Sequence, residues 1–177
     1  MKAFSRRLAI AAFAVGLAGA VGAQPVELAE RYTGDGWSIS HPSGWIVDVQ
    51  ALPALATDAD ALATMQRNAP LPPGGITIGI VPPGMYGALG LDPSATAEAA
   101  IVEIAEFFGG EGTVEPFTGT SHMAFARALE GTTRVPPMTT LIVAEVSGGV
   151  VTFLVVAEDF AAVTPLVEAI VSSFSVP

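Results

Sequence analysis

The sequence predicts an α+β fold, an α/β/α sandwich with a mainly antiparallel central sheet. Two nearly continuous apolar runs, residues 139–146 and 150–157, are separated only by Ser147-Gly148-Gly149. This pattern predicts a hairpin of central strands that are covered on both faces. Two other segments, residues 92–108 and 164–174, carry apolar side chains at helical spacing and would form the covering layers. Predicted hairpins outnumber strand–helix–strand units, so we expect mostly antiparallel pairing.

Shorter strands are expected along the rest of the chain. Residues 37–41 alternate apolar and polar side chains, residues 42–44 form a turn, and residues 45–49 would be the second strand of that hairpin. Residues 76–81 read as a strand because they alternate and are rich in β-branched residues. Residues 123–130 alternate in the same way.

A first helix is predicted over residues 57–67. Thr57 or Asp58 would cap its N-terminus, and Leu62 and Met65 would point inward. The proline and glycine residues between 70 and 75 would end it.

The two covering helices have clear start or stop signals. Asp92 is expected to cap the first, with Pro93 at its first helical position, and Gly109-Gly110 to end it. The second is expected to begin at Thr164-Pro165. Each has one buried stripe, formed by Ile101, Ile104, Ala105 and Phe108 in the first and by Val167, Ile170, Val171 and Phe174 in the second.

The N-terminus has the order of a secretory signal peptide. Lys2, Arg6 and Arg7 precede an apolar run, and small residues end at Ala23, where cleavage is expected. We therefore predict a signal peptide over residues 1–23, a flexible leader over 24–35 and a single domain over 36–177. The protein would be periplasmic, extracellular or associated with the cell surface, with no membrane span after cleavage. The arginine pair leaves open which export route is used.

Charge and composition exclude several classes of function. After cleavage the chain would keep four basic and 17 acidic residues, a formal charge of 4 − 17 = −13. Such a surface repels phosphate backbones and anionic headgroups, which disfavours nucleic-acid and membrane-surface roles. The chain has no cysteine, which excludes disulfides, thiol nucleophiles and thiolate metal sites.

The segment Trp37-Ser38-Ile39-Ser40-His41-Pro42-Ser43-Gly44-Trp45 resembles the opening of PsbP/Mog1-like domains. In that superfamily an aromatic residue and an alternating strand precede proline, any residue, glycine and tryptophan. The resemblance covers roughly residues 35–177 and implies an α/β/α sandwich. Its members include extrinsic photosystem subunits, nuclear-transport factors and exported bacterial proteins, and they share no catalytic set. It therefore implies no active-site residues.

Catalytic and metal-binding arrangements are weakly supported. Ser43 with His122 would be the best Ser–His pair, but Ser43 lacks the glycine-flanked elbow of hydrolases. Copper ligands would have to come from the two histidines, His41 and His122, and from methionines such as Met85, Met123 and Met138, which have no recurring spacing. We expect no catalytic residues, no metal and no cofactor.

The best candidate surface is the segment of residues 81–91. It has no charged residue, is broken by three glycines, and carries Met85, Tyr86, Leu89 and Leu91, the predicted binding residues. It would either fold onto the sheet as a lid or display a contact patch. The leading hypothesis is an exported, monomeric, non-catalytic binding or accessory module for a protein partner. A small hydrolase and a carrier of an apolar small molecule are the alternatives.

Overall fold

The computed structural model describes residues 26–50, 54–67 and 69–177. The predicted signal peptide and its cleavage site after Ala23 lie outside these residues. In chain order the elements are β1 (Glu30–Gly34), β2 (Trp37–His41), β3 (Trp45–Asp48), β4 (Ala54–Asp58), α1 (Ala59–Gln66), β5 (Ile76–Val81), the 3₁₀ turns η1 (Pro83–Met85) and η2 (Gly87–Leu89), α2 (Ala97–Phe108), β6 (Glu115–Pro116), β7 (Ala124–Ala128), β8 (Thr139–Val146), β9 (Gly149–Ala157) and α3 (Phe160–Ser173).

The central sheet has seven strands in the order β3-β4-β5-β9-β8-β7-β6, and each neighbouring pair is antiparallel. The β8–β9 hairpin lies at its centre and pairs over its whole length, from Thr139↔Val156 to Val146↔Gly149. β1 and β2 form a separate two-stranded sheet. The α+β class and the mainly antiparallel sheet are confirmed.

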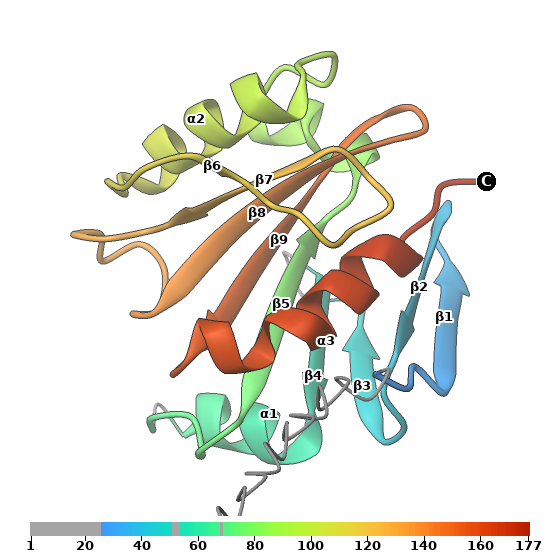
Figure 1. Ribbon diagram of the computed structural model, residues 1–177, viewed down its shortest axis with the longest axis vertical. Coiled ribbons are helices and arrows are strands. Elements are labelled where there is room, and N and C mark those ends of the chain that lie inside the picture. Colours follow the sequence, from blue (N-terminus) through green and yellow to red (C-terminus); the bar gives the residue numbers. More distant parts are fainter. Residues whose placement is uncertain (1–25, 51–53, 68) are drawn as a thin grey trace, which may run out of the picture.

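Helices cover both faces of this sheet (Figure 1). Along β8, Leu141 and Val143 belong to the cluster that packs with α2, whereas Ile142 and Ala144 belong to the cluster that packs with α3. Since successive side chains of a strand point to opposite faces, α2 and α3 lie on opposite sides of the sheet. This is the predicted three-layer sandwich.

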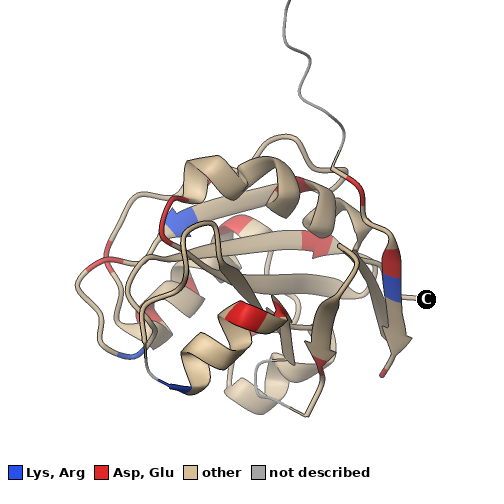
Figure 2. Ribbon diagram, turned by 90° about the horizontal axis from the view of Figure 1, so that it is seen from below, with Lys and Arg blue, Asp and Glu red and all other residues tan. Residues whose placement is uncertain are grey.

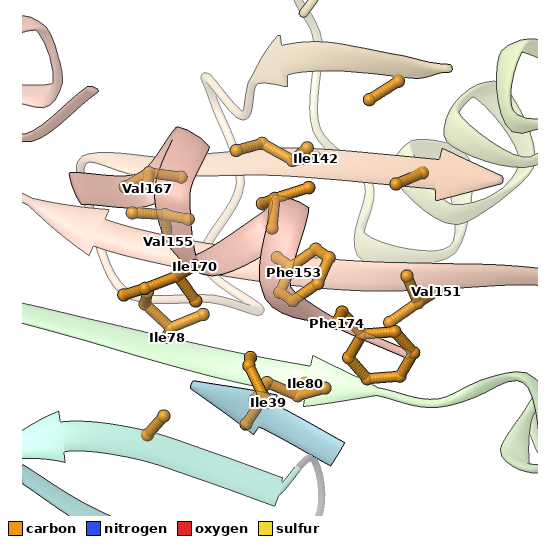
Figure 3. Packing of buried hydrophobic residues seen from close by; sticks show 14 of the residues in the cluster. Ile39, Ile78, Ile80, Ile142, Val151, Phe153, Val155, Val167, Ile170 and Phe174 are labelled. Atoms are coloured by element: carbon orange, nitrogen blue, oxygen red, sulfur yellow. The ribbon is translucent and has the colours of Figure 1, made fainter. Parts of the chain in front are cut away.

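The larger core lies beneath α3. The predicted stripe of this helix is buried, and Phe174 follows at its C-terminal end (Figure 3). The buried side chains of α3 and Phe174 pack in one cluster with Ile78 and Ile80 of β5 and Phe153 of β9. Burial of each such side chain contributes about 1.5–3 kcal/mol to the free energy of folding. Figure 2 shows acidic positions on helices, strands and loops, with few basic ones among them.

The predicted hairpin of residues 37–49 is wrong, although both of its strands exist. β2 pairs with β1, and β3 pairs with β4. Residues 42–44 do turn the chain: Trp45 N–H donates to the Pro42 carbonyl, and Gly44 has φ 77°. The turn thus carries the chain from one sheet to the other. Trp37 is buried and Trp45 is half-buried against the same core.

The predicted flexible leader is also corrected, because its last residues form β1. The guanidinium of Arg31 donates to the hydroxyls of Ser38 and Ser40 on β2 and of Ser175 beyond α3. Ser38 and Ser175 also exchange backbone hydrogen bonds. Arg31 therefore fastens the β1–β2 hairpin to the end of α3, a long-range contact that local patterning does not reveal.

Two helices begin elsewhere than predicted. α2 starts at Ala97, where Thr96 accepts a hydrogen bond from Ala99 N–H and Glu145 of β8 accepts one from Ala97 N–H. Asp92 instead accepts from the backbone and hydroxyl of Ser94, so it forms a local turn ahead of the helix.

α3 begins at Phe160 with Asp159 as its N-cap, and Pro165 lies inside the helix. Proline removes one backbone hydrogen bond from the helix, and its ring crowds the carbonyl four residues earlier, so Pro165 weakens the first turns of α3. In α1, Asp58 is the cap, as expected, but Ala61 and Thr64 are buried instead of Leu62 and Met65.

Candidate functional site

The structure divides the predicted site in the segment of residues 81–91 between core and surface. Tyr86 has no exposed area and Leu91 is buried, both in the cluster beneath α2. Met85 is half-buried, and Leu89 is 38% exposed. Tyr86 and Leu91 therefore act as a lid on the sheet, while Met85 and Leu89 remain accessible.

Tyr86 anchors the segment through its hydroxyl as well as its ring. The hydroxyl is hydrogen-bonded to that of Thr152 on β9, which is also buried. Burial raises the pKa of Tyr86 well above its ordinary value, although the Thr152 bond lowers it in part and the charge of Glu103 raises it further. The side chain is thus a neutral phenol fixed to a central strand.

Met85 lines a groove at the end of the sheet where three turns meet. We call this the turn groove; its cavity volume is about 550 Å³. The β1–β2 turn, the segment after β5 and the β8–β9 turn come together there. The lining residues are Asp35, Gly36, Trp37, Val49, Ala54, Pro82, Pro83, Gly84, Met85, Ser147, Gly148 and Val176.

Local sequence fixes each wall of the turn groove. Asp35 and Gly36 adopt φ 52° and φ 80°, the left-handed pair that a tight hairpin turn requires. Gly148 has φ 84° in the second hairpin turn. Pro82 ends the ladder of β5 because it has no N–H, and its carbonyl accepts from Met85 N–H at 3.0 Å. The walls are therefore short, well-defined turns.

The groove is largely apolar with one carboxylate. Asp35 is the single ionisable residue among its lining residues, and it accepts a hydrogen bond of 2.8 Å from the Tyr32 hydroxyl. This bond raises the pKa of Tyr32, since the phenol would lose it on ionisation. Sequence reasoning missed Asp35, although the dipeptide Asp35-Gly36 is a strong hairpin signal that would have located this turn.

The residues considered for hydrolysis are not hydrogen-bonded to one another, although Ser43 and His41 both contact the Glu30 carboxylate. The Ser43 hydroxyl donates to Glu30 Oε1 at 2.9 Å, and Nδ1 of His41 lies 3.0 Å from the Pro42 carbonyl. Nε2 of His122 lies 3.2 Å from the carbonyl of Phe174. A Ser–His nucleophile needs the serine hydroxyl bonded to the imidazole, and these three side chains do not form that arrangement.

The methionines considered as copper ligands are also separated. Met138 directly precedes β8, whereas the Met123 carbonyl accepts from Glu145 N–H near the other end of that strand. At about 3.4 Å per residue, Met138 and Met123 lie roughly 24 Å apart along the strand. Across residues 26–50, 54–67 and 69–177, no group of three or more His, Cys, Asp or Glu is arranged to hold a metal ion.

In the part of the chain that the structure describes, none of the helices combines the length and apolar character needed to cross a membrane.

No protein-family model matches this chain, and no curated protein matches it. Among solved structures, the chain is similar to the solution structure of cyanobacterial PsbP (CyanoP) from Synechocystis sp. PCC 6803. The two are 19% identical, the alignment covers 84% of this chain and 92% of that one, and the TM-score is 0.43. The likeness concerns the fold and says nothing about what this chain binds.

Proposed function

We propose that this protein is an exported, non-catalytic binding or accessory module that contacts a partner protein through the turn groove. The observation that carries the proposal is the groove itself, in which Met85 meets two hairpin turns. Methionine adapts to irregular apolar surfaces, and turns carried on a rigid sheet are common binding elements. The working compartment would be the periplasm, the cell surface or the medium.

The anchored lid supports the proposal because it holds the groove in shape. Tyr86 follows Met85 directly and is fixed to Thr152 in the core. Met85 is therefore presented from a segment that cannot swing freely, which reduces the entropy lost when a partner binds. Leu91 fixes the other end of the same segment, and Leu89, between these anchors, is an exposed apolar side chain outside the lining of the turn groove.

Photo-crosslinking in the native host tests this directly. A photoreactive phenylalanine analogue replaces exposed Ser147 at the groove, and a matched control carries it at Val102, which is 40% exposed on α2. A discrete partner should crosslink from position 147 and not from 102. Met85→Ala should weaken binding of that purified partner by about five-fold or more, the effect of truncating a binding hot spot. Equal crosslinking from both positions, or unchanged affinity, would refute the proposal.

The two alternative functions have their own assays. Turnover of an ester, peptide or phosphoester by the purified protein, abolished by Ser43→Ala or His122→Ala, would establish a hydrolase. An apolar compound that co-purifies and is seen by native mass spectrometry would establish a carrier. Either result would replace the binding-module proposal.

A further inference from the structure

A second groove lies at the opposite end of the β8–β9 hairpin from the turn groove. We call it the methionine groove; its cavity volume is about 690 Å³. One wall is formed by the end of α1 and the segment after it, the other precedes β8, and the end of β9 also lines the groove. The lining residues are Met65, Ala69, Pro70, Leu71, Pro136, Pro137, Met138, Val156, Ala157 and Glu158.

Met138 is the most unusual residue of this groove. Its side chain is 62% exposed although it is large and apolar, and its backbone has φ 62°. A non-glycine residue rarely adopts this left-handed conformation, and β-carbon crowding opposes it. Thr139 donates its hydroxyl to the Pro136 carbonyl at 2.6 Å, which closes the turn that holds Met138 outward. Unusual backbone of this kind is often found where a surface has a function.

Both walls are stiff. Pro136 and Pro137 each have a fixed φ, so the segment before Met138 has little freedom. On the other wall, Ala69 N–H donates to the Thr64 carbonyl, which folds the chain back against α1. The groove is therefore formed before any partner arrives, which favours binding of an inserted apolar side chain.

The charge around the groove selects the chemistry of the partner. Glu158 is its single ionisable lining residue. A smaller adjoining groove shares Pro137, Met138, Ala157 and Glu158 and adds Glu130. Both carboxylates are on exposed residues, and neither has a salt-bridge partner among the described residues.

Two of the arginines come near these walls in sequence but are engaged elsewhere. Arg134 donates to the Phe107 carbonyl at the end of α2, and Arg67 donates to the Thr64 hydroxyl. An apolar groove edged by free carboxylates suits apolar side chains that stand next to lysine or arginine.

We infer that the methionine groove binds an extended segment of a partner protein that carries large apolar side chains beside lysine or arginine. A second copy of this chain is a poorer occupant, because two mature chains, each with 17 acidic residues and four basic ones, would repel. The site is separate from the turn groove, so the two proposals stand or fall independently.

The probe is a fluorescent synthetic peptide of about 12 residues in which leucines alternate with lysine and serine, since short extended segments of this length fill such grooves. Two matched peptides replace either all leucines by serine or all lysines by glutamate. Anisotropy should show the first peptide binding about ten-fold or more tightly than either control, with affinity falling as salt is raised. Equal binding of the serine peptide would overturn the inference, because charge alone would then explain it.

Met138→Ala tests the site, and Met123→Ala is its matched control because Met123 is 64% exposed at the other end of β8. Alanine carries a β-carbon as methionine does, so the steric cost of the positive φ stays similar and the fold should be kept. Met138→Ala should weaken binding about five-fold or more and Met123→Ala less than two-fold. Glu158→Gln should weaken binding of the peptide that carries lysine but not binding of the control peptide in which glutamate replaces lysine. Equal loss in both methionine variants would overturn the inference.

Chemical-shift mapping with the same peptide shows which of the two grooves it binds. Shifts at Leu71, Met138 and Ala157 are expected. Shifts at Gly36, Met85 and Gly148 instead would overturn this inference and direct the peptide to the turn groove. Concentration-dependent dimerisation that Met138→Ala abolishes would show that a second copy occupies the groove, which also contradicts it.

Discussion

Tyr86→Ala should be among the most destabilising substitutions in the segment that carries the predicted site. The side chain has no exposed area and touches the core beneath α2. Truncation of a buried aromatic side chain lowers the free energy of unfolding by about 3–5 kcal/mol. For a domain of this size, each kcal/mol corresponds to about 2–4 °C in Tm, so the expected loss is about 6–20 °C. Leu89→Ala, on the exposed part of the same segment, should change stability by less than about 0.5 kcal/mol.

Tyr86→Phe isolates the hydroxyl. It removes the partner of a buried Thr152 hydroxyl, and an unsatisfied buried group lowers stability by about 1–3 kcal/mol. Thr152→Val in the same chain removes the second polar group and should recover most of the loss. Urea unfolding of the two single variants and the double variant gives the coupling energy. Two results would refute the conclusion that Tyr86 anchors a lid: additive losses of unfolding free energy in the double variant, or a Tyr86→Ala variant within about 1 kcal/mol of the parent.

Four further predictions concern the pH dependence of stability, the Arg31 contacts of the β1–β2 hairpin, metal binding and cleavage of the signal peptide. Burial raises the pKa of Tyr86 in the folded state, so its contribution to the free energy of unfolding is complete below about pH 10 and falls above it by up to about 1.4 kcal/mol per pH unit. Urea unfolding at pH 9 and pH 11 should show this loss. Tyr86→Phe should make the loss smaller. Arg31→Ala should lower stability by about 1–2 kcal/mol and speed amide exchange in β1 and β2, with Arg31→Lys intermediate. Calcium, zinc and copper should leave Tm unchanged, whereas a metal bound at 100 times its dissociation constant would add about 2.7 kcal/mol. N-terminal sequencing of the exported protein should begin at Gln24, and an intact Met1 would contradict cleavage.

The strands and helices with strong periodicity could be predicted from the sequence. The bounds of β2, β5 and β8 are as expected, and the stripe of α3 is buried as its spacing indicated. These signals are local, because the apolar residues within each element recur with the period of a strand or a helix. Asp58 as the cap of α1 is of the same kind, because a cap depends on residues within one turn.

Partners distant in sequence could not be predicted. Nothing local shows that β2 pairs with β1 instead of β3, or that Arg31 reaches residues more than 140 positions away. The N-cap of α2 depends in part on Glu145, which the sheet brings to the helix. Such contacts exist only once the elements have packed.

The candidate site shows the same division. The sequence by itself determined that residues 81–91 form an uncharged apolar connection, because composition is a property of the chain. Only the tertiary structure decided that Tyr86 turns into the core while Met85 faces a groove. Tyr86 is held there because Thr152 bonds to its hydroxyl, and Met85 lines a groove because the two hairpin turns lie beside it. The methionine groove likewise depends on three segments that meet only in the fold, since its lining comes from the end of α1 and the residues after it, from the residues before β8 and from the end of β9.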